Sequence, residues 1–180
     1  NYCVSAKLRE EHIRFVRKGE AVRLGGFEIV PFDVPHDSTD NVGYSVQHGD
    51  VNFCLITDAG HVTEDFGTYI EKANYLVLEA NHDEDMLMMG AYPAYLKGRI
   101  RGKYGHLSNK AAAQVLAEHA TERLRHVWLC HLSEENNHPE LARKTVDACL
   151  RSVGIVAGKD FDLEVLKRRM PSGIYELAGK

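Results

Sequence analysis

Residues 51–61, Val51-Asn52-Phe53-Cys54-Leu55-Ile56-Thr57-Asp58-Ala59-Gly60-His61, pass from an apolar run directly into polar side chains. The apolar run predicts a strand. Residues 42–46 predict a partner strand, joined to it in a hairpin by a turn at His48-Gly49-Asp50. Further strands are expected at 27–32, 75–78, 126–130, near 161–166 and at 173–177, and helices at 6–18, 63–72, 109–119 and 139–152. This alternation without a break predicts an α/β fold in a single domain over 1–180.

Composition narrows the class of protein. The 180 residues are 44% hydrophobic and 27% charged, which is typical of a globular chain and excludes disorder and coiled coil. A net charge of −4 argues against a globally basic nucleic-acid binder, although a local basic patch stays open. The four scattered cysteines form no Cys-x-x-Cys pair. Without a visible signal peptide or a long apolar run, we expect a cytoplasmic protein with no membrane contact.

The expected strands end in polar residues at several points along the chain. His36 follows the strand at 27–32, Asp58 follows 51–56, Glu79 follows 75–78 and His131 follows 126–130, while His106 precedes a helix. Open α/β sheets gather such strand ends at one edge. Imidazoles and carboxylates together suit Zn²⁺, Mn²⁺ or Fe²⁺. Each ending alone is more often a hydrogen-bonded surface or turn residue, so only their coincidence favours a metal site.

In their residues and in their order along the chain, these motifs resemble those of the metallo-β-lactamase-fold hydrolases, and within that family the YycJ (WalJ)-like branch of exonucleases. The resemblance covers roughly residues 27–153. It is carried by Val34-Pro35-His36-Asp37, Thr57-Asp58-Ala59-Gly60-His61-Val62, Leu78-Glu79-Ala80-Asn81-His82-Asp83, Gly105-His106-Leu107-Ser108-Asn109 and Cys130-His131-Leu132-Ser133-Glu134-Glu135-Asn136-Asn137. It implies an αββα sandwich, of which this chain would be the C-terminal two-thirds.

The resemblance also implies roles for particular residues. His36 and His131 would each bind one of two divalent metal ions, Zn or Mn, and Asp58 would bridge the two. His106 would act beside the scissile phosphate, as general acid or by orienting the oxyanion, and Glu79 would orient His106. The reaction implied is hydrolysis of a phosphodiester in nucleic acid by a metal-bound hydroxide, as in an exonuclease.

One departure from the family concerns its His-x-His-x-Asp-His motif, which supplies most of the remaining ligands. No His-x-His occurs in the sequence. The family pattern places this motif before the segment matched here, so we expect the chain alone to be metal-poor and inactive. We also expect it to expose sheet surface that favours self-association into a homo-oligomer. A protein that had lost the motif would give the same sequence pattern.

A basic stretch next to His106 bears on the substrate. Lys97, Arg99, Arg101 and Lys103 lie within seven residues that contain no acid, and we expect them to bind substrate phosphates. This favours a phosphodiester over a lactam or thioester substrate. As the nucleic acid we expect DNA more than RNA. Three alternatives stay open: the charges form a solvated helix face, the same site hydrolyses a small ester, lactone or thioester, or the chain is a non-catalytic interaction module.

Overall fold

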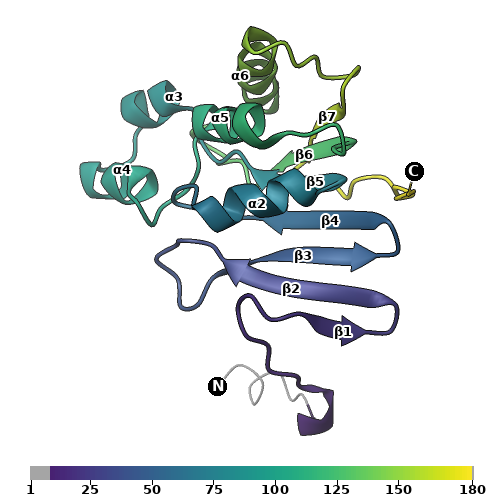
Figure 1. Ribbon diagram of the computed structural model, residues 1–180. Coiled ribbons are helices and arrows are strands. Elements are labelled where there is room, and N and C mark those ends of the chain that lie inside the picture. Colours follow the sequence, from purple (N-terminus) through teal and green to yellow (C-terminus); the bar gives the residue numbers. More distant parts are fainter. Residues whose placement is uncertain (1–8, 180) are drawn as a thin grey trace.

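The strands pair in chain order into one seven-stranded sheet, β1-β2-β3-β4-β5-β6-β7 (Figure 1). The computed structural model describes residues 9–179. Neighbouring strands from β1 to β4 are antiparallel, and those from β4 to β7 are parallel. The strands are β1 (Val22–Leu24), β2 (Phe27–Asp33), β3 (Val42–His48), β4 (Val51–Ile56), β5 (Tyr75–Glu79), β6 (His126–Cys130) and β7 (Asp162–Val165).

The helices that connect the parallel strands are α2 (Glu64–Lys72), α3 (Glu84–Met89), α4 (Ala94–Arg101), α5 (Asn109–His119) and α6 (Pro139–Ser152). Of these, α2, α5 and α6 cover one face of the sheet, and α3 and α4 lie beyond the strand ends (Figure 1). The core lies between this face and helices α2, α5 and α6. Its fully buried side chains include Ile56, Leu76, Leu78 and Leu129 from the strands and Phe66, Ile70, Leu116 and Leu150 from the helices. The α/β prediction is therefore confirmed.

Local signals predict most elements to within a residue or two. The hairpin of β3 and β4 is confirmed, with Gly49 in the left-handed region at φ 56°. Thr63 and Ser108 cap α2 and α5 through their side chains, and Pro139 is the first residue of α6, after His138. A strand missed by the sequence reading is the short edge strand β1, which pairs with β2.

The helix expected at 6–18 is wrong where it can be judged. Residues 6–8 lie outside the described residues, and the only regular structure from 9 to 18 is a 3₁₀ turn, η1 (Glu10–His12). Phe15 is 95% exposed, so the apolar side of the expected helix has no described surface to pack against. Short amphipathic helices depend on such packing for their stability.

The strand expected at 173–177 is also wrong. This segment crosses the sheet face opposite the helices and does not pair along an edge. Tyr175 packs edge-on against Trp128, with 4.9 Å between ring centroids, and its hydroxyl donates to Glu164. The Tyr75 hydroxyl donates to the Ala178 carbonyl. Contacts made through side chains hold the segment in place without a backbone ladder.

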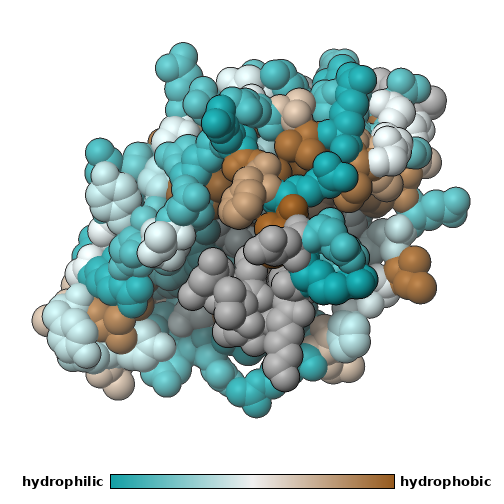
Figure 2. Space-filling view, turned by 90° about the horizontal axis from the view of Figure 1, so that it is seen from below, coloured by the Kyte–Doolittle hydropathy of each residue, from teal (hydrophilic) through white to brown (hydrophobic). Residues whose placement is uncertain are grey.

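The antiparallel end of the sheet exposes some apolar surface. Leu24 in β1 is 59% exposed and Phe27 in β2 is 47% exposed. Figure 2 shows the molecule from below, where hydrophobic side chains gather in patches between hydrophilic ones. Within residues 9–179 no helix is long and apolar enough to cross a membrane.

Candidate metal centre

Four strands that run in the same direction bring the polar endings to one edge of the sheet. Glu79 is the last residue of β5, His131 directly follows β6, and Asp58 lies two residues beyond β4. His36 follows β2, which is antiparallel to β3 and therefore parallel in direction to β4. The edge predicted from the sequence is thus the edge at which these side chains meet.

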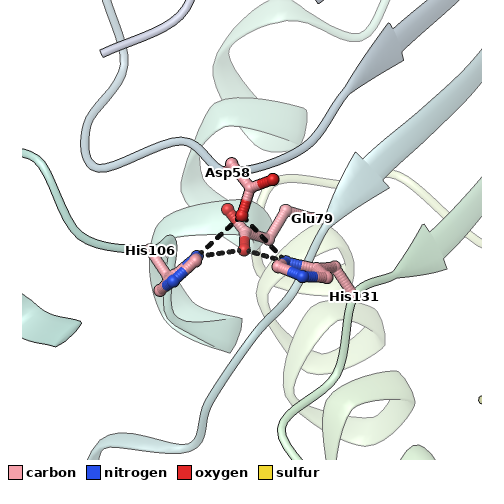
Figure 3. Close-up of side chains that lie close together, drawn as sticks. All are labelled: Asp58, Glu79, His106 and His131. Atoms are coloured by element: carbon pink, nitrogen blue, oxygen red, sulfur yellow. Dashed lines mark hydrogen bonds and ion pairs between the residues drawn. The ribbon is translucent and has the colours of Figure 1, made fainter. Parts of the chain in front are cut away.

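The side chains form a compact group around Asp58 (Figure 3). Asp58 Oδ1 lies 3.6 Å from Nδ1 of both His106 and His131, and 3.7 Å from Nε2 of His36. Asp58, Glu79, His106 and His131 each offer a ligand atom within 4.8 Å of the others. The five candidate residues are therefore gathered into one cluster.

Glu79 is the buried centre of this cluster. Its side chain is fully buried, and its Oε1 accepts from Nδ1 of His106 at 2.8 Å and of His131 at 2.7 Å. Its Oε2 accepts the backbone N–H of Ala59 at 2.7 Å. Burial by itself raises the pKa of Glu79, but the hydrogen bonds from both histidines outweigh it and hold the pKa below its ordinary value. Glu79 is therefore an anion that orients two imidazoles.

The hydrogen bond to Glu79 fixes which ring nitrogen of each histidine stays available. Because Nδ1 of His106 and of His131 donates to the carboxylate, Nε2 of each ring is left for another partner. The same hydrogen bond raises the pKa of His131. A carboxylate behind an imidazole is the usual support for a metal-binding histidine. The sequence reading gave Glu79 one histidine partner, and the structure gives it two.

Two of the candidate ligands adopt strained backbone conformations. Asp58 has φ 55° and His131 has φ 57°, a region that favours glycine. In each case an asparagine amide holds the carbonyl of the strained residue. Asn41 Nδ2 donates to Asp58 O at 2.9 Å, and Asn81 Nδ2 donates to His131 O at 2.8 Å. Backbone strain of this kind concentrates at functional sites.

A buried amide pair below the site was missed by the sequence reading. Asn137 Nδ2 donates to the carbonyls of Ala80 and Asn81, at 2.9 and 3.0 Å. The side chains of Asn109 and Asn137 bond each other at 2.8 and 2.9 Å. These asparagines fix the segment after β5 against the start of α5. They stand in the quoted motif strings, but asparagine at a strand end is equally typical of turns.

The donor set fits a divalent metal ion. Imidazole nitrogens and carboxylate oxygens are the ligands that zinc and manganese accept. In addition, Nε2 of His36 is buried and has no hydrogen-bond partner among residues 9–179, while Nδ1 accepts from the Ser38 amide. A buried nitrogen without a partner beside Asp58 is a place where a metal would supply the missing interaction.

The basic stretch lies next to the cluster, and most of its side chains have internal partners. Arg99 forms a two-pronged ion pair with Asp37, the residue after His36. Lys97 Nζ donates to the Met88 carbonyl at 2.8 Å, and Arg101 approaches Met88 Sδ at 3.1 Å. The ammonium of Lys103 has no carboxylate partner among the described residues and lies 5.9 Å from the Tyr104 ring centroid.

Close backbone packing ties this stretch to the Asp58 loop. His61 Nδ1 bonds the Lys103 carbonyl at 2.8 Å. A Cβ on Gly60 would collide with that same carbonyl, and a Cβ on Gly105 would collide with the Ile100 carbonyl. Glycine at these two positions lets residues 97–106 approach the metal cluster.

Comparisons with known proteins identify the family of the chain. The sequence profile of a family described as "Beta-lactamase superfamily domain" matches residues 2–131. "Exodeoxyribonuclease YycJ" of Bacillus anthracis is 36% identical over 156 residues, which are 87% of this chain and 59% of that protein. "Exodeoxyribonuclease WalJ" of Streptococcus pneumoniae is 36% identical over 143 residues, 79% of this chain and 53% of that protein. The chain thus spans somewhat more than half the length of these relatives.

Solved structures support the fold. The metallo-β-lactamase fold protein YhfI of Bacillus subtilis superposes with a TM-score of 0.60 at 16% identity, over 84% of this chain and 52% of its own. Zn²⁺-bound PqqB of Methylobacterium extorquens gives 0.55 at 18% identity, over 84% of this chain and 53% of its own. At these identities the similarity concerns the fold.

Proposed function

The chain belongs to the β-lactamase superfamily, in the branch of the YycJ and WalJ proteins, and we propose that its site hydrolyses phosphodiester bonds of DNA as part of a metal-dependent exonuclease. The fold implies binding of divalent metal, and the cluster offers ligands for it. Two ions, Zn or Mn, are our proposal for the complete site. DNA is proposed over RNA because both relatives are named exodeoxyribonucleases.

The observation that carries the proposal is the convergence of His36, Asp58 and His131 around a buried Glu79–His106 pair. We assign His36 and His131 to one metal each and Asp58 to both. When bound, such ions activate water and draw charge from a phosphate. Three side chains do not fill two coordination spheres, so the proposed site needs further ligands, among them water and substrate.

His106 has the arrangement of a proton donor. Its Nδ1 donates to the buried carboxylate of Glu79, which holds the ring in one orientation. Nε2 is then the ring nitrogen left to exchange a proton with the oxygen that leaves phosphorus. Glu79 does not touch the substrate in this scheme and acts as a positioning residue for His106.

We propose Lys97, Arg99, Arg101 and Lys103 as contacts to substrate phosphates, with Lys103 first among them. Its ammonium has no carboxylate to displace, and its carbonyl is fixed by His61. Arg99 would have to share its guanidinium with Asp37. Self-association through the exposed apolar surface and a cytoplasmic location remain predictions.

The test uses the full reading frame that contains this chain. We expect release of nucleotides from 5′-phosphorylated single-stranded DNA with Mn²⁺, and loss of at least 100-fold of that activity in Asp58→Ala, which is about 2.7 kcal/mol of barrier. The matched control is Asp50→Ala, in the exposed hairpin turn, which should keep full activity. Equal activity of Asp58→Ala and Asp50→Ala would refute the metal assignment. No release by any variant would refute the nuclease.

A further inference from the structure

A cavity of about 410 Å³ opens on the side of His106 that faces α5. The Asp58 loop contributes Gly60, His61 and Val62 to its wall, and the first turns of α5 contribute Ser108, Ala111 and Gln114. His106 therefore lines both the metal cluster and this cavity. Anything bound in the cavity would lie beside the group that delivers the proton.

The lining of the cavity is mostly polar and includes a smaller apolar part. Val62, Leu107, Ala111 and Val115 form the apolar part. Gln114 makes no side-chain hydrogen bond within residues 9–179 and is free to donate and accept. Planar heterocycles are bound by such walls, which contact their faces while a few polar groups pair with their edges.

His82 is the most informative residue of the lining. Its side chain is 2% exposed, and Nδ1 is buried with no hydrogen-bond partner in the described part of the chain. Burial lowers the pKa of His82 to about 4, so the ring is neutral at physiological pH. Because the ring is neutral, it adds no positive charge that would favour an anionic ligand in the cavity.

The charges of the lining argue against an anion in the cavity. Arg101 is its only permanent cation, whereas Glu84 and Glu118 are carboxylates. Glu84 accepts hydrogen bonds from Ser108 and Lys110. The negative charge of Glu118 then offsets the positive charge of Arg101. Arg101 is also the one member of the basic stretch that reaches this lining, so a phosphate would meet less positive charge in the cavity than along the rest of that stretch.

We propose that this cavity binds the nucleobase of the nucleotide whose phosphate reaches His106. The inference rests on the proposed function and adds a base subsite to it. The volume of about 410 Å³ lies at the lower end of the range of about 300–1,000 Å³ for ligand pockets. It therefore suits a single nucleoside and excludes a base pair.

The test is binding of uncharged nucleosides, followed by NMR without metal and without catalysis. Deoxyadenosine or thymidine is added to the metal-free protein of the full reading frame that contains this chain, and methyl phosphate serves as the anion without a base. We expect shifts of the Val62 and Val115 methyl signals and the His82 ring signals with the nucleosides, and nuclear Overhauser contacts from base protons to Val115. Methyl phosphate should leave these signals unchanged.

A matched pair of substitutions ties binding to the cavity. Ala111→Leu fills the cavity from α5 and should weaken nucleoside binding at least tenfold. Ala148→Leu makes the same change at an exposed position of α6, outside the lining, and should bind as the unchanged chain does. Because Ala111→Leu could impair folding, Gln114→Ala at an exposed position serves as a second variant, with an expected severalfold loss.

Three outcomes would overturn the base subsite. The first is no nucleoside binding at millimolar concentration, the second is equal binding by Ala111→Leu and Ala148→Leu in folded protein, and the third is methyl phosphate shifting the cavity signals. Nucleoside binding in the cavity together with failure of the DNA assay would instead refute the proposed nuclease alone. The two failures are therefore distinguishable.

Discussion

Strand β5 runs from the apolar core into the polar cluster at the edge of the sheet, and these two regions differ in chemistry and in backbone strain. Leu78 and Glu79 are consecutive and both fully buried. Leu78 packs in the apolar core under the helices, as do Leu76 and Phe66. Glu79, one residue later, lies among His106, His131 and the Ala59 amide as an anion. The core is uniform in chemistry and relaxed, whereas the edge of the sheet is polar and strained.

This difference indicates where the fold gains stability and where it gives some up. Burying a large apolar side chain contributes about 1.5–3 kcal/mol. A non-glycine residue in the left-handed region costs about 1–2 kcal/mol. Asp58 and His131 both sit there, at the edge. The stability of the core therefore compensates for the strain at the edge. A core substitution should lower the free energy of unfolding and leave metal binding intact. Removing a strained ligand at the edge should raise the free energy of unfolding and abolish metal binding.

The largest effect is expected in the core. Phe66→Ala removes a fully buried ring from α2 and should lower the free energy of unfolding by about 3–5 kcal/mol, because a cavity remains where the ring was. Urea unfolding at neutral pH measures it. In the full reading frame that contains this chain, the folded fraction should still bind metal as the unchanged protein does, because Phe66 contacts none of the cluster.

The control for this prediction lies on the same helix. Thr68→Ala changes an exposed residue of α2 and should alter the free energy of unfolding by less than about 0.5 kcal/mol. The contrast between core and edge would be wrong if Phe66→Ala lost metal binding while remaining folded.

A smaller effect is expected from acid, and its largest single contribution comes from the edge. Burial also lowers the pKa of His126 at the other end of β6, and the Glu79 hydrogen bond raises that of His131. His82, three residues after Glu79, has its pKa lowered to about 4 by burial, below the ordinary 6.5. Between these values the unfolded chain binds the proton and the folded chain does not, so stability rises with pH over this window. From pH 7 to pH 5 the loss attributable to His82 is about 2 kcal/mol.

Two variants isolate this contribution. His82→Gln should flatten the pH dependence of the urea midpoint between pH 5 and 7, whereas His48→Gln, at an exposed turn, should leave it steep. If the pH profiles of the unchanged chain and of His82→Gln are parallel, burial does not lower the pKa of His82.

The same contrast explains what the sequence could predict. The helix-covered region follows local rules, so Ser108 as a cap, Pro139 at a first helical position and the apolar run 126–130 define α5, α6 and β6 almost to the residue. The helix expected at 6–18 is wrong because a short amphipathic pattern forms a helix only where its apolar side can pack. The described residues offer no surface for that packing.

The edge could be predicted in outline only. Strand order brings His36, Asp58 and His131 together, and the sequence anticipated this. The sharing of Glu79 by two histidines, and the asparagine supports of the strained carbonyls, depend on distances between segments up to 52 residues apart. Asn41 and Asn81 carried no distinguishing signal, because asparagine is common in any turn.

The smallest effect, and the most specific to the edge, is a gain in stability on removing a metal ligand. Asp58→Gly places the residue that tolerates φ 55° best at that position and keeps the carbonyl that Asn41 holds. Relief of strain of about 1–2 kcal/mol outweighs the entropy cost of glycine, about 0.5–1 kcal/mol. The free energy of unfolding of the metal-free Asp58→Gly variant in urea should therefore rise by about 0.5–1 kcal/mol, while calorimetry should show the loss of metal binding.

The control is Asp50→Gly, at a position outside the left-handed region. Its free energy of unfolding should fall by a similar amount, and it should keep metal binding. If both variants lose stability equally, the backbone at Asp58 is unstrained, and the edge differs from the core in polarity alone.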